Sequence, residues 1–392
     1  MVREADGATP VLLVATATQW YGAARMARCL AEAGFAVSML TPRNSPSAKS
    51  RYIAKLGYLP DNAAPREWTY AFAATVKATS PRLVLPCDDM AVRLMYALVL
   101  SPPEHLQRAL WFELAALITE SLGSPSHYRA SIDKTLISAT AQALGIRVPP
   151  YAVASNPDDA ERFAQRHGYP VVLKRGYSSA GNGVSICSDG DELLREFAAL
   201  SRPTGANLGD VRDGLLLVQA HIPGHTHYHN SVAWKGVLLA GQASIQLAAV
   251  PKGPASVVRY YHSRELRSMS ASLAAGFGIT GIFVPEFIVH EVTQEPYLIE
   301  VNRRMTQGTH RGATFNVNLG AALYAAVHGM PCMTRTDLDP GEEHIVVHFP
   351  HEWMRDPASR YLRDFPTDVP WDEPELVEAI VAQTMAAFRT EA

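Results

Sequence analysis

The sequence has little cysteine, and the cysteines it has are scattered. Its 392 residues include four, Cys29, Cys87, Cys187 and Cys332. These form no Cys-x-x-Cys pair and none of the short spacings of a zinc site. We therefore expect reduced thiols and a cytoplasmic protein.

Long apolar runs and runs of one charge are also missing. No stretch approaches the ~18 consecutive apolar residues of a membrane-spanning helix. The short run from Val11 to Ala17 leads into Gln19-Trp20-Tyr21-Gly22, so we interpret it as a buried strand and not as a signal peptide. Lys and Arg number 35 and Asp and Glu 38, for a net charge of −3. This balance gives no indication of nucleic acid or an acidic membrane as a partner.

Several signatures of common enzyme sites are absent as well. No G-x-G-x-x-G follows the first expected strand, and neither G-x-x-x-x-G-K-[ST] nor G-x-S-x-G occurs. A Rossmann dinucleotide site, a P-loop and a serine nucleophile are therefore poorly supported. The composition, 47% hydrophobic and 19% charged, is ordinary for a globular enzyme. At ~150 residues per domain, the length suggests two to three domains.

The first 125 residues alternate between expected strands and helices, which is typical of a doubly wound α/β domain. Strands are expected at 11–14, 35–40 and 83–86, and a helix at 23–33. Asp88 and Asp89 follow the third of these strands. Ligands of open parallel sheets bind at the carboxyl ends of strands, which makes both residues candidate substrate contacts. We favour the simpler interpretation that Asp88 caps the next helix.

A lysine and a loop of small residues follow further along the chain. The β-branched run 171–175 predicts a strand with Lys174 near its end, and 184–187 predicts the return strand. In the loop 176–183 between them, backbone amides can approach an anion closely, and the lysine adds a charge for phosphate. A loop of this composition is more often simply a flexible turn, so both interpretations stay open.

A pair of glutamates gives the stronger signal. If 281–290 and 297–302 form a hairpin centred near Thr293, Glu286 lies opposite Glu300, and Glu300 and Asn302 share a face. Opposed carboxylates on a buried face repel each other, and divalent cations resolve that conflict. Carboxylate and amide oxygens suit Mg²⁺, with Mn²⁺ as the substitute. The alternative is a solvated hairpin face, against which the apolar neighbours argue: Ile282, Val284, Ile288 and Leu298.

Basic residues follow this face. Arg303 and Arg304 end the strand, and His310 and Arg311 lie in the polar loop beyond it. An arginine beside a magnesium–phosphate centre can stabilise a transferring phosphoryl group, and a second can hold a carboxylate. Taken singly, each arginine is more simply explained by a surface ion pair.

From about residue 133 to 329, half of the chain, the sequence resembles the ATP-grasp superfamily of carboxylate–amine ligases. The motifs that carry the resemblance are, in the family's order, Asp133-Lys134, Gly145-Ile-Arg-Val-Pro149, Tyr169-Pro-Val-Val-Leu-Lys174, Gly181-Asn-Gly-Val184, Glu286 and Leu298-Ile-Glu-Val-Asn-Arg-Arg304. The resemblance implies an α/β domain at 1–125, a small α+β subdomain with the glycine-rich loop at 126–220, a large subdomain with the magnesium site at 221–330, and a C-terminal extension at 331–392.

The resemblance also implies roles for residues, with ATP and Mg²⁺ as cofactors. The implied phosphate contacts are Lys134, Lys174, Gly181 and Gly183. The implied contacts to adenine, through the backbone, are Gln219, Ala220, His221 and Ile222. The implied Mg²⁺ ligands are Glu286, Glu300 and Asn302. The resemblance also makes Arg304 a contact to a phosphate or an acyl phosphate. The candidate catalytic residues are Arg304, Arg303 and Lys174.

Two positions depart from the family's pattern. Arg303 stands where the family commonly has proline, which adds a charged side chain to the expected reaction centre. His227 stands near the glutamate that the family uses for the ribose. His225, His227 and His229 alternate, so on a strand they share a face. A lining or substrate-contacting face, an exposed edge and, less strongly, a zinc site are the alternatives.

The reaction implied by the resemblance joins an acid and an amine. ATP phosphorylates the carboxylate to an acyl phosphate, the amine attacks it, and ADP and phosphate are released. The expected substrates are small molecules such as amino acids, contacted by candidates that include Arg259, His310, Arg311 and Asp88. The alternatives are an ATP-binding regulatory or scaffold module without turnover, and a kinase that stops at the phosphorylated acid. A homodimer is expected only as the commonest oligomer.

The C-terminal end predicts a helix at 373–389. Its apolar stripe of Leu376, Ile380, Val381 and Met385 indicates docking on the body of the protein.

Overall fold

The computed structural model describes residues 8–18, 21–60, 63–178, 183–202, 214–251 and 253–391, the last five of these by their backbone alone. The chain divides into two compact units. Unit 1 comprises Met1–Pro125, His229–Val284 and Asn302–Ala392, and unit 2 comprises Ser126–Tyr228 and Pro285–Val301. Both units are therefore built from segments that lie far apart in the sequence. The four-part division expected from the sequence stays a prediction.

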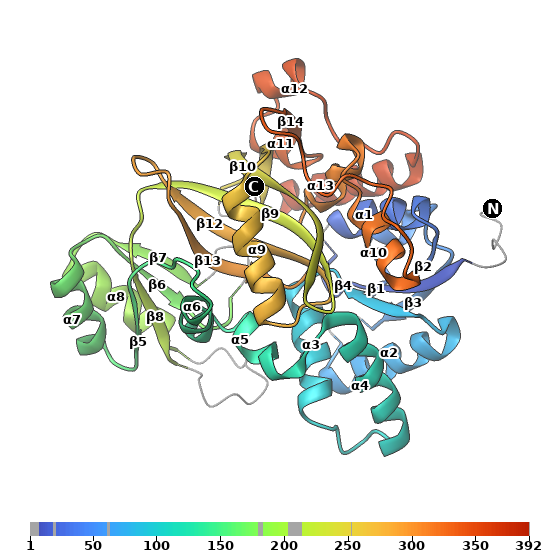
Figure 1. Ribbon diagram of the computed structural model, residues 1–392, viewed down its shortest axis with the longest axis horizontal. Coiled ribbons are helices and arrows are strands. Elements are labelled where there is room, and N and C mark those ends of the chain that lie inside the picture. The colour runs from blue at the N-terminus through green and yellow to red at the C-terminus, as the bar shows by residue number, and fades with distance from the viewer. Residues whose placement is uncertain are drawn as a thin grey trace. The chain divides into compact units, whose positions relative to one another are not determined.

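Unit 1 begins with a parallel sheet, as the alternating pattern predicted. Its strands are β1 (Thr9–Val14), β2 (Phe35–Pro42), β3 (Lys55–Leu59) and β4 (Leu83–Pro86), in the order β3-β2-β1-β4. The helices that alternate with them are α1 (Gly22–Glu32), α2 (Pro65–Thr79), α3 (Asp89–Leu100) and α4 (Arg108–Leu122). The blue and cyan ribbon in Figure 1 follows this part of the chain. Strand β4 is buried at every residue, as expected where helices cover both faces of a parallel sheet.

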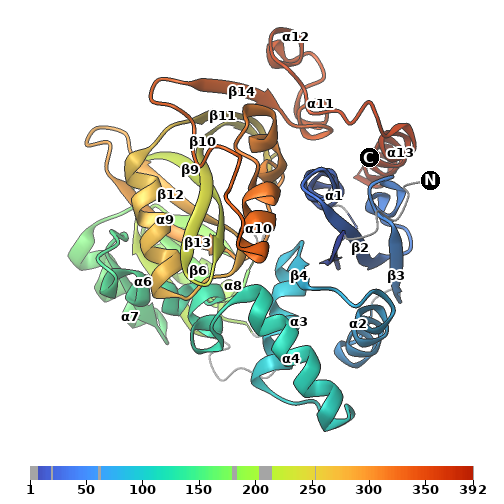
Figure 2. The same ribbon diagram turned by 45° about the vertical axis from the view of Figure 1, so that its right-hand side comes forward.

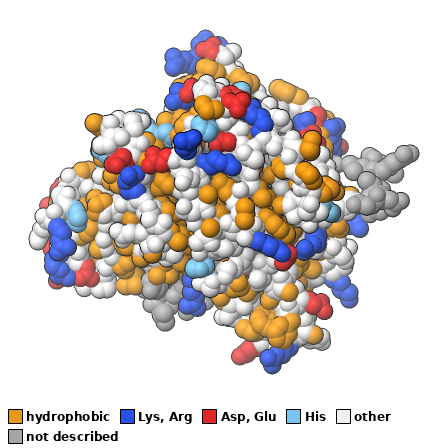
Figure 3. All heavy atoms as spheres, viewed as in Figure 1, with side chains coloured by type: hydrophobic (Ala, Val, Ile, Leu, Met, Phe, Trp, Pro, Cys, Tyr) orange, Lys and Arg blue, Asp and Glu red, His pale blue; other side chains and the backbone are white. Residues whose placement is uncertain are grey.

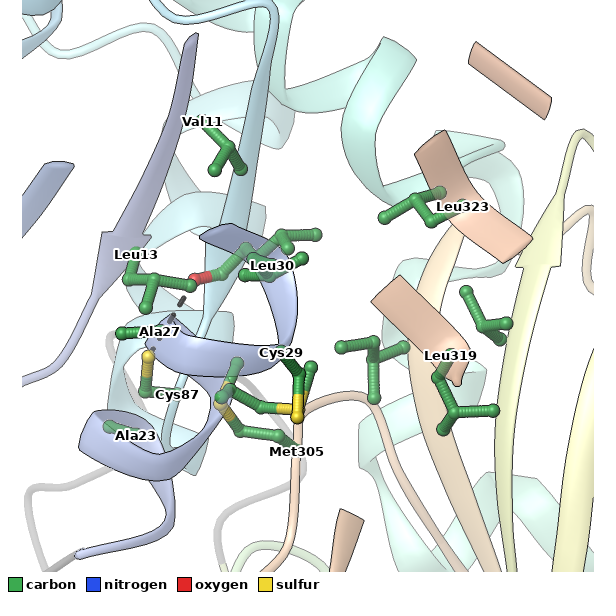
Figure 4. Packing of buried hydrophobic residues seen from close by; sticks show 14 of the residues in the cluster. Val11, Leu13, Ala23, Ala27, Cys29, Leu30, Cys87, Met305, Leu319 and Leu323 are labelled. Carbon is green, nitrogen blue, oxygen red and sulfur yellow. Dashed lines mark hydrogen bonds between the residues drawn. The ribbon is translucent and has the colours of Figure 1, made fainter. Parts of the chain in front are cut away.

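Helix α1 lies at the centre of the main core of unit 1. It lies between β2 and helix α10 (Leu319–His328) (Figure 2). Ala23, Ala27 and Leu30 face the sheet side, where Leu13 and Cys87 lie (Figure 4). Their spacing of four and three residues puts these side chains on one stripe of the helix.

The opposite side of α1 is also packed. Cys29 lies beside Met305 in Figure 4, and both side chains are buried. Burial raises the pKa of the Cys29 thiol to about 12, so this cysteine is an unreactive core residue. All four cysteines are free thiols, and three of them are buried.

A second sheet has six strands. They are β9 (Gly224–Trp234), β10 (Val237–Ala249), β11 (Ala255–Tyr261), β12 (Gly281–His290), β13 (Pro296–Asn302) and β14 (Glu343–Val347), in the order β13-β12-β9-β10-β11-β14. Lys235 and Gly236 connect β9 to β10, both with positive φ, 49° and 83°, as a two-residue hairpin turn requires. Helix α9 (Arg264–Gly276) packs on β10. The sequence analysis located β12 and β13 but not β10, β11 and β14.

Unit 2 contains a four-stranded sheet with two helices against it. Its strands are β5 (Tyr151–Ala154), β6 (Val171–Arg175), β7 (Val184–Cys187) and β8 (Leu216–Ala220), in the order β5-β8-β6-β7. Helices α7 (Pro157–His167) and α8 (Gly190–Leu200) pack on this sheet around a core that includes Phe163, Leu173 and Phe197 (Figure 1). Helices α5 (Tyr128–Ile132) and α6 (Lys134–Ala143) precede it. The predicted strands 171–175 and 184–187 are confirmed as β6 and β7.

The remaining elements of the chain belong to unit 1, apart from the turn η2 (Pro125–His127). They are the turns η1 (Pro46–Lys49) and η3 (Thr309–Phe315) and helices α11 (His351–Arg355), α12 (Arg360–Asp364) and α13 (Pro374–Glu391). No helix in the described ranges is long and apolar enough to cross a membrane. On the face shown in Figure 3, basic and acidic side chains are interspersed, in line with the net charge of −3.

The stripe predicted for α13 is half correct. Leu376 and Ile380 are fully buried, in a cluster with Tyr21 and Ala24. Val381 and Met385 are wrong as docking residues, because 44% and 52% of their surface is exposed. The buried residues of α13 are spaced by four and continue from Leu376 and Ile380 to Thr384. The Thr384 hydroxyl donates to the Ile380 carbonyl at 2.8 Å. A polar residue thus ends a stripe that apolar periodicity alone assigned to its neighbours.

Leu376→Ala is expected to lower the free energy of unfolding by about 2–5 kcal/mol, because it leaves a cavity in a fully buried cluster. Met385→Ala on the same helix is expected to change it by less than about 0.5 kcal/mol, because that side chain is half exposed. Urea unfolding followed by circular dichroism measures both. Equal effects of the two substitutions would contradict this docking face.

Candidate functional site

Lys134 links three segments of unit 2. It is the first residue of α6, whose cap Asp133 accepts hydrogen bonds from the Thr135 amide at 2.8 Å and the Thr135 hydroxyl at 2.7 Å. Its buried ammonium donates to the Ser178 carbonyl at 2.7 Å and forms an ion pair with Glu300 at 2.9 Å. The start of a helix, the loop after β6 and strand β13 therefore meet at one lysine.

Lys174 on β6 lies within electrostatic reach of the same group. Burial lowers its pKa to about 8, while Glu300 and, less strongly, Glu286 raise it and Lys134 lowers it. The structure thus brings together four residues from distant parts of the sequence, since 166 positions separate residue 134 from residue 300. They are Lys134, Lys174, Glu286 and Glu300. Two ammonium groups face two carboxylates, so the set is balanced in charge.

Tyr228 belongs to this group and was missed by the sequence analysis. Burial raises the pKa of its hydroxyl, and the carboxylates of Glu286 and Glu300 raise it further. Tyr228 lies on β9 between His227 and His229, so its side chain leaves the opposite face of the strand from theirs. The alternating pattern of the histidines could have identified Tyr228, because it places this side chain on the face of the strand opposite to the histidines.

The small residues around the loop allow close packing. A Cβ at Gly176 would meet the Asp133 carboxylate at 2.8 Å, and a Cβ at Gly183 would meet the Cβ of Ser178 at 2.9 Å. Gly183 also has a φ of +87°, where side chains are strained. Gly181 lies outside the described residues. The part of the loop that is described is therefore held against the cap of α6, beside Lys134.

The residues predicted to contact adenine lie at the end of β8. The Ala220 amide donates to Pro150 at 2.9 Å and the His221 amide to Pro170 at 3.3 Å. The buried Gln219 side chain donates to the Ser138 hydroxyl at 3.3 Å. A contact to adenine through the Ala220 and His221 amides would compete with their hydrogen bonds to Pro150 and Pro170. Ile222, the last of the predicted adenine contacts, follows His221. The assignment stays a prediction.

The three predicted magnesium ligands occupy β12 and β13. Glu286 and Glu300 are half-buried, and Asn302 is buried. The Asn302 Nδ2 lies 3.5 Å from the Val284 carbonyl of β12. The side-chain oxygen of Asn302 is therefore the atom that could bind a metal. Glu300 already contacts a cation, the Lys134 ammonium. Carboxylate and amide oxygens are the donor atoms that Mg²⁺ prefers, and the Glu300 carboxylate already lies 2.9 Å from a cation.

The alternating histidines do not form a zinc site in the described part of the chain. No group of three or more His, Cys, Asp or Glu side chains there could hold a metal ion. His229 is fully buried, its Nδ1 lies 2.6 Å from the Ser231 hydroxyl, and burial lowers its pKa to about 3. It is a neutral core residue, whereas His227 is half-buried and His225 exposed.

The two predicted catalytic arginines are both engaged in unit 1. Arg304 forms a bidentate pair with Asp89, with distances of 2.8 Å from Nε and 2.9 Å from Nη2. Arg303 donates to the Leu122 carbonyl at the end of α4 at 2.6 Å. Both side chains are buried. Arg303 therefore anchors a helix terminus, a role that the sequence analysis did not predict. Asp89, which the sequence offered as a candidate substrate contact, is a partner of Arg304.

Asp88 is the cap of α3, which confirms the interpretation favoured from the sequence. Its carboxylate accepts from the amides of Ala91 at 2.9 Å, Thr16 at 2.5 Å and Ala17 at 3.0 Å, and from the Thr16 hydroxyl at 2.6 Å. It thereby ties the loop after β1 to the end of β4. A substrate contact would have to displace one of these bonds.

The remaining substrate candidates lie in two places. Arg259 on β11 pairs with Glu343 on β14 at 3.4 Å, a partly exposed ion pair. His310 lies 3.2 Å from Asp368, and burial lowers the pKa of His310 to about 4. His310 and Arg311 line a cavity in unit 1. Arg259 does not line that cavity.

Glu300→Gln is expected to lower the free energy of unfolding by about 1–3 kcal/mol, because it leaves the buried Lys134 ammonium without its charged partner. Glu295→Gln is the matched control, because Glu295 pairs with Arg147 in the same unit but both side chains are about 40% exposed, at 43% and 39%. It should cost less than about 1 kcal/mol. Thermal unfolding compares the two, and a larger cost for the control would refute the charge balance described here.

Comparison with known sequences identifies the segment that holds the lysines. Residues 133–234 match the family described as carbamoyl-phosphate synthase L chain, ATP binding domain. The carbamoyl phosphate synthase large chain of Rubrobacter xylanophilus is 23% identical over 321 residues, which are 77% of this chain and 28% of the relative. That of Rhodopirellula baltica is 27% identical over 188 residues, 45% of this chain and 16% of the relative. The chain thus spans less than a third of the length of these relatives.

Solved structures share the fold over most of the chain. The biotin carboxylase domain of Hydrogenobacter thermophilus 2-oxoglutarate carboxylase, solved with MgADP, ADP and bicarbonate, has a TM-score of 0.64 at 17% identity and covers 85% of this chain and 73% of that one. N5-carboxyaminoimidazole synthetase from Staphylococcus aureus has a TM-score of 0.60 at 11% identity, covering 86% and 81%. The chain therefore shares the fold of these structures, the ATP-grasp fold that its motifs predicted, and residues 133–234 match an ATP-binding domain.

Proposed function

We propose that the chain is an ATP-dependent carboxylate–amine ligase that forms an amide bond between small molecules and releases ADP and phosphate. The observation that carries the proposal is the meeting of Lys134 and Lys174 with Glu286 and Glu300. These lysines lie in the segment that matches an ATP-binding domain. A purely structural site has no use for four ionisable groups in one half-buried place, because their desolvation costs free energy.

The lysines are assigned to the phosphates of ATP, and the oxygen ligands to Mg²⁺. Glu286, Glu300 and Asn302 would hold the metal, which when bound neutralises phosphate charge and polarises the γ-phosphoryl group. Lys134 would then exchange its ion pair with Glu300 for a phosphate oxygen and keep its bond to the Ser178 carbonyl. The ion pair thus holds the lysine in place until nucleotide arrives.

The chemistry proposed is two displacements. A carboxylate oxygen of the first substrate attacks the γ-phosphorus, and the bond from that phosphorus to the bridging oxygen of ADP breaks. The amine nitrogen then attacks the acyl carbon, phosphate leaves with the bonding pair, and the nitrogen loses a proton to solvent. Positioning and charge neutralisation suffice for both steps, so no protein nucleophile is needed.

The arginines have a narrower place in this scheme. Arg304 is proposed to contact the phosphate or acyl phosphate, for which its guanidinium has to share or leave its bidentate pair with Asp89. Arg303 supports it through its bond to the end of α4. Asp88 and Arg259 stay candidates for substrate contacts, although each has protein partners.

Product analysis tests the function. The protein is incubated with Mg-ATP and pools of carboxylic acids and amines, and nucleotides and adducts are separated and weighed by mass spectrometry. ADP and phosphate that depend on one acid and one amine, with a product lighter than their sum by one water, establish the ligase. AMP and pyrophosphate would refute the acyl-phosphate route. ADP formed with an acid alone indicates a kinase, and tight ATP binding without turnover of any pool indicates a regulatory module.

Lys174→Met is expected to weaken ATP binding at least about tenfold, because a charge-assisted contact to phosphate is lost. Isothermal titration calorimetry measures this affinity. Lys235→Met is the control, because Lys235 is exposed in the β9–β10 turn and forms only a surface ion pair with Glu120, at 3.6 Å, and a contact with the Trp234 ring. Equal affinities of the two variants would remove Lys174 from the nucleotide site.

ATP affinity is expected to fall as pH rises through about 8, because the Lys174 ammonium deprotonates there and not near 10.5. The free energy of unfolding is expected to change in the opposite direction and to rise with pH. Between pH 8 and 10.5 the folded chain holds fewer protons than the unfolded chain, so the free-energy cost of burying the Lys174 charge decreases as pH rises through that window. Binding at pH 8.5 should therefore take up protons, which titrations in buffers of different ionisation enthalpy measure. Proton uptake that persists in Lys174→Met would contradict the assignment.

A further inference from the structure

A cavity in unit 1 has charged groups of both signs in its wall. It has a volume of about 250 Å³ and lies where α1, the turn η3 and the segment before α13 come together. Its charged residues are Arg25, Arg28, Glu32, Arg311, Asp368 and Glu373. Three arginines face three carboxylates, and the lining His310 adds no charge at neutral pH because burial lowers its pKa to about 4. The cavity is therefore strongly polar but balanced in charge.

Two of these charged groups have no ion-pair partner among the described residues. Arg25 pairs with Asp368 at 3.2 Å, and Arg28 pairs with Glu32 at 2.7 Å. Arg311 and Glu373 form no ion pair with any described residue; Glu373 accepts hydrogen bonds through Oε1 from the Ser50 hydroxyl at 2.5 Å and the Arg51 amide at 3.1 Å. One cation and one anion thus remain in a single wall.

Buried atoms without hydrogen bonds belong to the same residues. Arg25 Nη1, Arg311 Nε and Glu373 Oε2 have no hydrogen-bond partner among the described residues. Arg25 and Glu373 are 6% and 3% exposed. A buried polar atom without a partner costs about 1–3 kcal/mol, which a bound polar group can offset. Burial also raises the pKa of Glu373, and this effect outweighs the hydrogen bonds from Ser50 and Arg51 and the charge of Arg25, which lower it.

We propose that this cavity binds a small zwitterion, an α-amino acid. Its carboxylate would contact Arg311 and Arg25, and its ammonium would contact Glu373. An anion alone would leave the Glu373 carboxylate beside it, and a cation alone would lie beside Arg311, so only a ligand with both charges matches the wall. The site does not depend on the proposed ligase activity, because the amino acid can bind as a substrate or as an effector.

Binding of the twenty proteinogenic L-amino acids to the full chain, without ATP, tests the proposal by isothermal titration calorimetry. At least one is expected to saturate. Its deaminated and decarboxylated analogues, each with a single charge, are expected to bind at least about tenfold more weakly, as are Arg311→Gln and Glu373→Gln. Arg82→Gln and Glu120→Gln are the matched controls, because these residues form a surface pair at 3.1 Å away from the cavity, and should bind as the unmodified chain does.

Three results would overturn the proposal: no amino acid saturates, a singly charged analogue binds as tightly, or both cavity variants keep full affinity. Melting temperatures show whether the variants fold; if Glu373→Gln does not, Arg311→Gln and the analogue series decide the outcome. Incorporation of the ¹⁵N-labelled amino acid into a product marks a substrate, and its recovery unchanged beside altered ADP release marks an effector. Since binding is measured without ATP, failure here is distinct from failure of the ligase, which the product analysis and Lys174→Met address.

Discussion

The balance of two ammonium groups against two carboxylates is the constraint on which the rest of unit 2 depends. Lys134 and Lys174 are both more than nine-tenths buried, at 5% and 7% exposure, which no isolated charge could sustain. Glu300 contacts one lysine directly and raises the pKa of the other. The helix cap at Asp133, the close approach of Gly176 and the strand β13 all serve to hold these groups together.

In unit 1, buried arginines have a different role, because they bind groups at or near the ends of helices. Arg303 holds the last carbonyl of α4, Arg304 holds Asp89 at the start of α3, and Arg25 holds Asp368 before α13. Each contact joins segments far apart in the sequence. Where such pairing is incomplete, as at Arg311 and Glu373, the surplus charges line a cavity. Recognition of a ligand and support of the fold thus draw on the same kind of residue.

Local sequence determined much of the architecture. Strands β1, β2 and β4 of the parallel sheet, strands β6, β7, β12 and β13, and the cap at Asp88 were predicted, because alternation, β-branched runs and capping residues act over a few positions. Strand β3 was not predicted. The residues Lys134, Lys174, Glu286 and Glu300 were also assigned together, on the order of their motifs. Strands β10 and β11 were missed, since their partners are set by the sheet and not by their own pattern.

Tertiary structure alone decided which charges are partners. Nothing within a few positions of Arg304 indicates Asp89, 215 residues earlier, or relates Arg25 to Asp368. The same holds for α13, where the sequence predicted an amphipathic helix but packing selected Leu376, Ile380 and Thr384 over Val381 and Met385. The sequence by itself determined many of the helices and strands and which chemical groups each segment carries, because those depend on neighbours along the chain. Which groups meet, which are neutralised and which remain available for a ligand depends on long-range packing, and only the folded chain decides it.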